Sequence, residues 1–127
     1  MAMNFDRYKK MNDDKEGSRV LDDATVKYTY TNGACGDGYV LYLKVSPQGL
    51  IEDSSYTTTG CGFGLAALSV LTRLVRGKTL DQAAAVGPAE IEADFEFPEK
   101  RRNYPVTAVE AMAGALSEAK KALAPAL

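Results

Sequence analysis

The sequence predicts an α+β domain in which three antiparallel strands come first and the helices that follow cover one face of the sheet. Two patterns support this fold class. Side chains alternate between apolar and polar over much of residues 25–57, whereas apolar residues recur every three or four positions over 62–123. With 127 residues, 46% of them hydrophobic and 25% charged, the chain has the size and composition of one domain, 1–127.

The strand signals follow a charged N-terminal segment. Residues 4–18 are dense in charge and contain few apolar residues, so we expect a short helix or a mobile arm in 1–18. The period of two then begins, and Val26, Tyr28 and Tyr30 fall on one face of a first strand.

Two further strands complete the predicted sheet. The run YVLYLKV at 39–45 is rich in aromatic and branched residues, which favours a strand. The sequence SPQG at 46–49 is typical of a turn, and 50–57 forms a return strand. The three strands therefore predict an antiparallel meander.

A helix is predicted over 62–76, because the period changes after Gly60 and Gly77 is well suited to follow a helix end. Thr79 and Gln82 form a capping-box pattern that opens a short helix through Val86. The apolar stripe of the first of these helices consists of Leu65, Leu68, Leu71 and Val75.

The last third of the chain is also predicted to be helical. Gly87-Pro88 begins a short turn that carries Ile91, and 97–102 (FPEKRR) is a polar loop. Pro105 is expected as the first residue of the final helix. Its apolar stripe consists of Val109, Met112, Leu116 and Leu123.

Composition excludes several classes of function. The chain has no histidine, which removes Ser-His and Cys-His catalysis and His-ligated zinc. A formal net charge of −2 predicts no nucleic-acid or anionic-membrane partner. No segment is apolar enough to span a bilayer and no export signal is recognisable, so we expect a cytoplasmic protein.

Two glycine-rich segments carry the candidate site residues. Cys35 and Asp37 lie between two predicted strands, and Cys61 lies where a strand meets a helix. In the cytoplasm reduced thiols are favoured over a disulfide. Exposed N–H groups at a helix start would favour the Cys61 thiolate. Two thiolates and a carboxylate form an incomplete, labile site for iron or zinc.

Simpler structural roles are the alternatives for these residues. Cys35 and Cys61 could be small buried hydrophobes, and Asp37 a turn residue. The glycines of 59–64 (TGCGFG) lack the pattern of a phosphate-binding loop, and we interpret them as providing flexibility around a cysteine.

Four segments match the residue types and order of a known family, over about 30–123. They are Ala34-Cys35-Gly36-Asp37, Gly49-Leu50-Ile51-Glu52-Asp53, Thr59-Gly60-Cys61-Gly62 and the nine residues 75–83 (VRGKTLDQA). On these segments the chain resembles the NifU/IscU family of iron–sulfur cluster assembly scaffold proteins. The resemblance implies the IscU-type (SufE/NifU-like) fold, a three-stranded antiparallel sheet with helices on one face.

The resemblance also implies a function. It assigns Cys35, Asp37 and Cys61 as ligands of iron and of an Fe-S cluster, most simply [2Fe-2S]. Cys61 would in addition accept persulfide sulfur from a cysteine desulfurase, and apo acceptor proteins would receive the cluster. Such a protein is a scaffold or carrier and not an enzyme. A Cys-nucleophile enzyme is disfavoured independently, because only Lys or Asp could serve as its base.

The chain departs from the family at the start of the last helix. The family has a His-Cys pair where this sequence has Asn103-Tyr104, so the third cysteine is missing. Tyr104 could bind iron through its phenolate or simply fill space beside the site. The family's Leu-Pro-Pro-Val-Lys chaperone motif is replaced by 97–101 (FPEKR), so we expect no such chaperone interaction. Lys100-Arg101-Arg102 is either a partner contact or a solvated loop.

The missing cysteine leaves two hypotheses open. A [2Fe-2S] cluster normally has four protein ligands, and a homodimer would supply four thiolates, two from each chain. Alternatively the protein holds no cluster and regulates a cysteine desulfurase or a complete scaffold.

Overall fold

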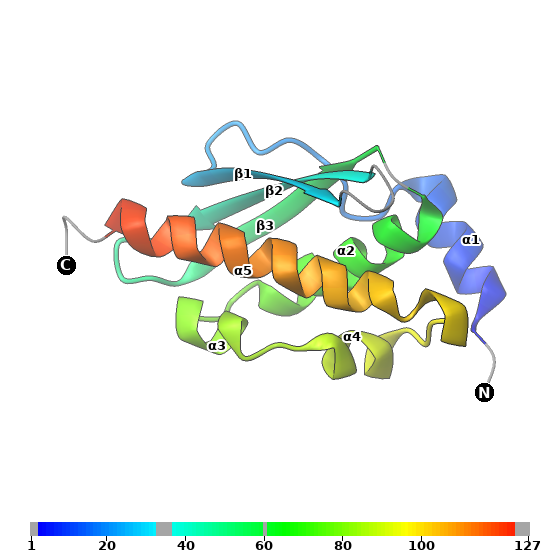
Figure 1. Cartoon of the computed structure of the whole chain (residues 1–127). Coiled ribbons are helices and arrows are strands. Elements are labelled where there is room, and N and C mark those ends of the chain that lie inside the picture. The colour runs from blue at the N-terminus through cyan, green and yellow to red at the C-terminus, as the bar shows by residue number, and fades with distance from the viewer. Residues whose placement is uncertain (1–2, 33–36, 60, 124–127) are drawn as a thin grey trace.

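The computed structural model describes residues 3–32, 37–59 and 61–123, and these form two layers. The sheet forms one layer and the helices lie against one of its faces (Figure 1), which confirms the predicted fold class. The elements in chain order are α1 (Phe5–Asp14), β1 (Val26–Asn32), β2 (Asp37–Val45), β3 (Ile51–Thr58), α2 (Gly62–Val75), α3 (Leu80–Ala84), α4 (Pro88–Asp94), the 3₁₀ turn η1 (Glu99–Arg101) and α5 (Asn103–Leu123).

The sheet has the order β1-β2-β3, and both strand pairs are antiparallel. The alternation of β2 aims Tyr39, Leu41 and Leu43 at the helices, and all three are completely buried. In β1, Val26 is buried and Tyr28 and Tyr30 pack partly against the same core, as predicted. The third strand begins at Ile51, because Leu50 is exposed and makes only an isolated bridge with Thr79.

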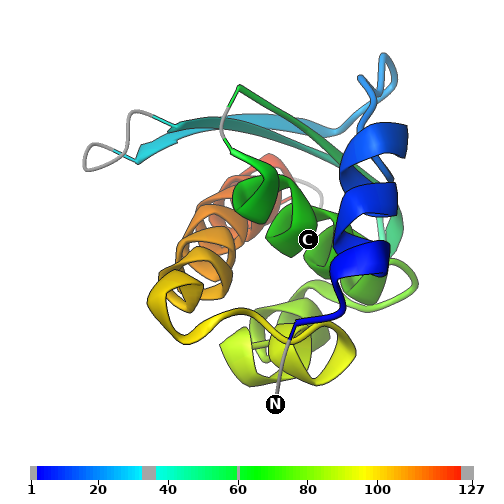
Figure 2. The ribbon, with the colours of Figure 1, turned by 90° about the vertical axis from the view of Figure 1, so that its right-hand side faces the viewer.

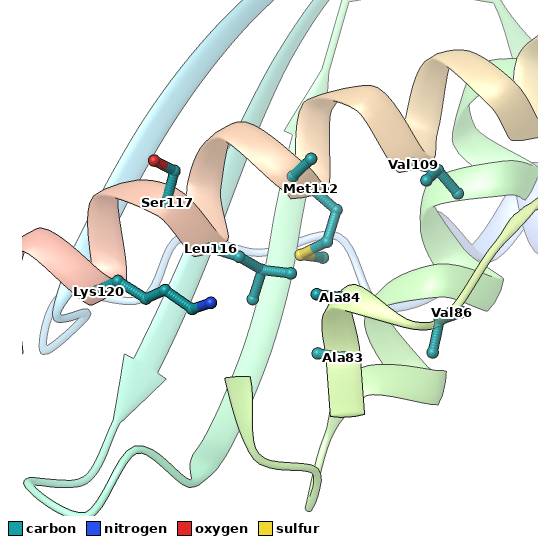
Figure 3. Close-up of a pocket in the computed structure, with 9 residues that line it drawn as sticks. Ala83, Ala84, Val86, Val109, Met112, Leu116, Ser117 and Lys120 are labelled. Carbon is teal, nitrogen blue, oxygen red and sulfur yellow. The ribbon is translucent and has the colours of Figure 1, made fainter. Parts of the chain in front are cut away.

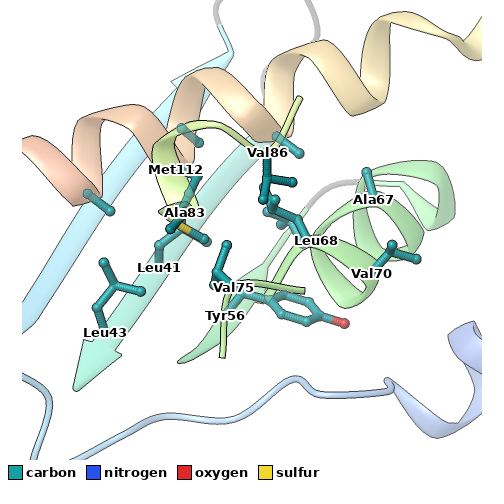
Figure 4. Packing of buried hydrophobic residues seen from close by; sticks show 14 of the residues in the cluster. Leu41, Leu43, Tyr56, Ala67, Leu68, Val70, Val75, Ala83, Val86 and Met112 are labelled. Carbon is teal, nitrogen blue, oxygen red and sulfur yellow. The ribbon is translucent and has the colours of Figure 1, made fainter. Parts of the chain in front are cut away.

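Helix α2 lies at the centre of the core. The four residues of its predicted stripe are all buried, and Gly77 has the positive φ (+81°) expected after the helix end. Burial extends beyond the stripe to Ala66, Ala67 and Val70, because α2 contacts the sheet and the other helices. Figure 4 shows Leu68, Val70 and Val75 of α2 packed with core residues of β2, β3, α3 and α5.

Helix α5 crosses the sheet beside β1 and β2. A row of small residues faces the core, which allows the helix backbone to lie close to the strands. The row consists of Ala108, Ala111, Ala115 and Ala119, each with no exposed surface. The helix begins at Asn103 and not at Pro105 as predicted. Proline is tolerated at this third position because the first four helical N–H groups have no partner within the helix.

The short helices between α2 and α5 begin at the predicted caps, but their ends differ from the predicted ones. The Thr79–Gln82 capping box is present in both directions, although α3 ends at Ala84 rather than Val86. Pro88 is the first residue of α4, and Ile91 is buried. The predicted polar loop is partly wrong: residues 99–101 form η1, and Phe97 belongs to the core.

The charged N-terminal segment forms a helix that packs against α2. Figure 2 shows α1 beside α2, below the level of the sheet. Met11 is buried in the common core, and Asn4 caps the helix through a hydrogen bond from the Arg7 N–H. Beyond the helix, Ser18 forms a parallel bridge with Tyr56 at the edge of β3. None of the helices in the described part of the chain combines the length and the hydropathy that a membrane span requires.

Candidate functional site

The structure describes the three predicted site residues to different extents. Cys35 lies outside the described residues. Asp37 is the first residue of β2, where its backbone pairs with Asn32 of β1, while its side chain lies outside the described part of the chain. Cys61 is described in full and is an exposed free thiol.

Cys61 is the N-cap residue of α2. Its backbone is extended (φ −76°, ψ 172°), and its carbonyl accepts the first helical hydrogen bond, from the Leu65 N–H at 3.2 Å. The thiol makes no capping hydrogen bond with the helix. The sulfur is therefore available to a ligand at the positive end of the helix, where negative charge is stabilised.

The backbone brings Asp37 and Cys61 to the same end of the sheet. Gly38, which follows Asp37, accepts a hydrogen bond from the Thr59 N–H at 3.1 Å. The Gly38 N–H in turn donates to Thr59 Oγ1 at 3.3 Å. Because Thr59 precedes Cys61 by two residues, the start of β2 and the start of α2 are neighbours across this pairing.

Helix α1 contacts the first turn of α2 next to Cys61. The Asn12 amide donates to the Gly62 carbonyl at 3.3 Å. The Tyr8 ring packs on Phe63, with ring centroids 4.9 Å apart. Burial raises the pKa of the Tyr8 hydroxyl, negative charge at Cys61 raises this pKa further, and the Arg101 guanidinium opposes both. Tyr8 and Arg101 therefore both lie within electrostatic reach of the site.

The aromatic wall beside Cys61 continues into the segment before α5. The Tyr104 ring lies 5.9 Å from Phe63, and the Arg101 guanidinium lies 5.5 Å above the same Phe63 ring. Tyr104 thus packs close to the start of α2. The ring therefore fills space beside Phe63, and binding of iron through the Tyr104 phenolate stays a prediction.

Close packing accounts for the glycines that follow Cys61, so the flexibility interpretation is wrong for Gly62 and Gly64. A Cβ at Gly62 would collide with the Tyr8 hydroxyl and with Asn12 Oδ1. A Cβ at Gly64 would lie 2.9 Å from the Tyr39 hydroxyl. Both glycines lie in a helix and permit neighbouring side chains to approach its backbone.

Tyr8, Asn12 and Arg101 were missed as site neighbours by the sequence analysis. About 50 residues separate α1 from Cys61, so no local spacing joins them. The one usable signal was the pair of glycines inside a predicted helix, because such glycines often mark a close backbone approach.

The described residues offer no alternative metal site. Among them, no three Cys, Asp or Glu side chains converge as a metal site. A cavity of about 230 Å³ lies between α3 and α5. Its lining, drawn in Figure 3, consists mainly of alkyl groups such as those of Val86 and Leu116. Its lining contains no thiol or carboxylate, so it is unsuited to iron.

Comparison with known protein families assigns the chain to one of them. The model of the NifU-like N terminal domain matches residues 5–124, and the chain belongs to this family. The match covers every helix and strand, from α1 to α5. The family resemblance stated from the sequence motifs is therefore confirmed.

Individual relatives agree with this membership. The chain is 37% identical over 87 residues to the iron–sulfur cluster assembly scaffold protein IscU of Escherichia coli (strain K12), covering 68% of each chain. It is 34% identical over 87 residues to IscU of Azotobacter vinelandii, again covering 68% of each. These relatives are named as scaffold proteins, which supports the predicted non-enzymatic function.

Solved structures show the same fold. A NifU-like protein (N-terminal) from Brucella abortus superposes with a TM-score of 0.66 and 21% identity, covering 91% of this chain and 92% of that one. A protein proposed as the iron–sulfur cluster assembly scaffold for the SUF system of Fervidobacterium islandicum AW-1 superposes with a TM-score of 0.65 and 20% identity, covering 86% and 93%.

Proposed function

We propose that this protein is a scaffold on which an iron–sulfur cluster is assembled and from which it is passed to acceptor proteins. Family membership and relatives named as scaffolds support this function. The observation that carries it is the exposed Cys61 thiol at the start of α2, close to the strand end that holds Asp37. Because the relatives are named as scaffolds, the cluster-free regulator is not favoured.

The ligands in this proposal are Cys35, Asp37 and Cys61. Iron and sulfur are the cargo, which the thiolates hold and later release. Within one chain, two soft sulfurs and one hard oxygen leave the coordination incomplete, so the thiolates of a recipient can displace them by ligand exchange. We also propose that the donor is a cysteine desulfurase: the Cys61 thiolate attacks the outer sulfur of the donor's persulfide, which leaves the persulfide on Cys61 and releases the donor's thiolate. A cytoplasmic location stays a prediction.

The composition favours a cluster shared between two chains. Each chain contains two cysteines and no histidine, whereas a [2Fe-2S] cluster normally takes four protein ligands. Tyr104 packs on Phe63 where the family has its third cysteine. A homodimer supplies four thiolates, two from each protomer, and is the simplest way to complete the set.

Anaerobic reconstitution with iron, sulfide and reductant tests the function and the stoichiometry together. Iron and sulfide are measured per chain, and light scattering gives the mass of the coloured species. We expect about one iron and one sulfide per chain in a dimer, which follows from one [2Fe-2S] cluster per two chains. A chelator that removes the iron should return the dimer to monomers, because the cluster is the proposed link.

Substitutions identify the ligands. Cys35→Ala and Cys61→Ala should each abolish cluster retention, and Asp37→Ala should slow cluster release. The matched control is Asp22→Ala, which removes an exposed carboxylate away from these segments. Cluster retention by either cysteine variant would contradict the assignment. A wild-type chain that stays monomeric, binds no iron and forms a stable complex with a cysteine desulfurase would favour the regulator instead.

A further inference from the structure

We propose that α1 forms one wall of the cluster-assembly site, where Asn12 positions the first turn of α2 and the Tyr8 hydroxyl donates to sulfur held at Cys61. This inference rests on the proposed function and adds two residues to it. Neither residue belongs to the ligand set of the sequence motifs, and both come from a helix about 50 residues away along the chain.

Asn12 ties the two helices together at the residue after Cys61. Its amide donates to the Tyr8 carbonyl at 3.0 Å within α1 and to the Gly62 carbonyl at 3.3 Å in α2. The Cys61 carbonyl accepts from the Leu65 N–H in the same turn. Because Cys61 and Gly62 share one rigid turn, a contact that holds the Gly62 carbonyl also limits where the Cys61 side chain can lie.

Packing holds the Tyr8 hydroxyl at the same turn. The ring packs on Phe63, at a centroid distance of 4.9 Å, and on Phe95, at 6.4 Å. These contacts direct the hydroxyl to Gly62, where a Cβ would overlap it. The absence of a side chain at Gly62 leaves room for the phenol immediately beside the residue that carries the thiol.

Additional contacts hold α1 in this position. Arg7 donates to the carboxylate of Asp94 in α4 at 3.1 Å. Met11 is buried in the core between α1 and its neighbours. Beyond the helix, Ser69 of α2 donates to Glu16 Oε2 at 2.8 Å. The helix is thus fixed at both ends, so the Tyr8 and Asn12 side chains are presented to α2 in a defined orientation.

A hydrogen-bond donor beside Cys61 would stabilise negative charge on the sulfur bound there. Thiolates and sulfide bring negative charge to the site, and the chain has no histidine that could offer an N–H. The phenolic O–H can donate to such a sulfur, and Arg101, above Phe63, supplies positive charge. Groups that hydrogen-bond to metal ligands commonly change metal affinity by about ten- to a hundredfold. Binding of iron and sulfur at Cys61 should also stabilise the packing of α1 on α2, and this packing should in turn strengthen the binding.

The test uses Zn²⁺ as the probe, with affinity measured by competition against a chromophoric chelator. Tyr8→Phe keeps the ring and removes only the hydroxyl, so we expect an unchanged melting temperature and about tenfold weaker Zn²⁺ binding. Asn12→Ala should weaken binding in the same direction. Lys10→Ala, an exposed change in the same helix, is the matched control and should bind as the wild type does.

Hydrogen exchange provides a second measurement. If Tyr8 had only a structural role, Zn²⁺ would not change the rate of amide exchange in α1. In the wild type, Zn²⁺ should slow amide exchange across α1, and this protection should shrink in Tyr8→Phe. Two results together would overturn the inference: all variants bind Zn²⁺ with equal affinity, and Zn²⁺ does not change amide exchange in α1. These results would leave the scaffold function intact. Failure of the wild type to bind Zn²⁺ at all would overturn this inference, and failure of anaerobic reconstitution as well would overturn the proposed function.

Discussion

Gly114 shows how much a single position depends on its neighbour. It lies inside α5, where glycine is a poor choice for an isolated helix. A Cβ there would overlap the ring of Tyr28 in β1, so the absence of a side chain lets the helix lie against the strand. The helix and sheet are in contact along this line.

Gly114→Ala should therefore destabilise the protein, although alanine is the better helix former. Displacing the Tyr28 ring costs packing, and we expect a loss of about 1–2 kcal/mol in the free energy of unfolding. Chemical denaturation measures it. In a Tyr28→Ala background the clash is absent, so the same glycine change should become neutral or stabilising. A stabilising effect in the wild-type background would contradict the contact.

Asp53 is a second residue whose role depends on distant partners. Its Oδ1 accepts from Arg19 at 2.7 Å and from the Ser54 N–H at 2.8 Å, and Arg76 lies 3.5 Å away. Although burial acts in the opposite direction, these bonds and positive charges hold the pKa of Asp53 below its ordinary value of 3.8. The carboxylate joins the segment before β1, the strand β3 and the end of α2.

Asp53→Asn should change the acid sensitivity of the fold. A lowered folded-state pKa contributes stability above the unfolded pKa, near 3.8, and this stability is lost as pH falls through the folded value. The wild type should therefore be more stable than the variant at pH 6, and the difference should shrink toward pH 3. Urea unfolding at each pH measures this. Asp22→Asn is the control, and an equal difference at both pH values would refute the linkage.

At the scale of elements, α1 is attached to two other helices through one carboxylate. Arg7 of α1 and Arg73 of α2 both donate to Asp94, the last residue of α4. Arg7 also donates to the Asp94 backbone carbonyl and lies 5.5 Å from the Phe95 ring. Asp94 of α4 therefore serves as a common acceptor for α1 and α2 and links the three helices.

Asp94→Ala should loosen α1 while the core stays folded. Removing the shared acceptor leaves both arginines without this partner, and partly exposed pairs of this kind contribute about 1 kcal/mol. We expect amide exchange to accelerate in Phe5–Asp14 and to change little in α5. Asp13→Ala, which breaks only an exposed pair with Lys9, is the control. Uniform acceleration over all helices would show that Asp94 supports the whole fold instead.

At the scale of the whole molecule, the number of thiols limits what one chain can hold. Two cysteines in 127 residues cannot by themselves complete the usual four-ligand set, however the chain folds. Tyr104, which the family resemblance places where the third cysteine would be, lies in the first turn of α5 beside Phe63. The position is thus close to the start of α2 and is occupied by an aromatic ring.

Tyr104→Cys should shift the loaded protein from dimer toward monomer, because each chain would then offer three thiolates at one site. Light scattering of the reconstituted variant, with iron and sulfide per chain, measures the change. Val106→Cys is the control, since it adds a thiol at an exposed position of the same helix. A Tyr104→Cys protein that still holds one cluster per two chains would contradict the dimer proposal.

The parts of the site differ in how far local sequence could predict them. Cys61 at a helix start follows from the change of period after Gly60 and is observed. Its neighbours Tyr8 and Arg101 come from α1 and η1, and no spacing in the sequence connects them to it. The expected start of α5 at Pro105 is wrong by two residues, because the stripe of a helix does not specify its first turn.

The sequence by itself determined the three strands, the helices α2, α3 and α5, the Thr79–Gln82 cap and the limit of two thiols, because these depend on local periodicity, capping chemistry and composition. Tertiary structure alone decided that α1 lies on the first turn of α2, that the Tyr8 and Asn12 side chains fill the space beside Gly62, and that a row of alanines faces the sheet. These features are contacts between segments far apart in the chain, and only packing of the complete core selects them.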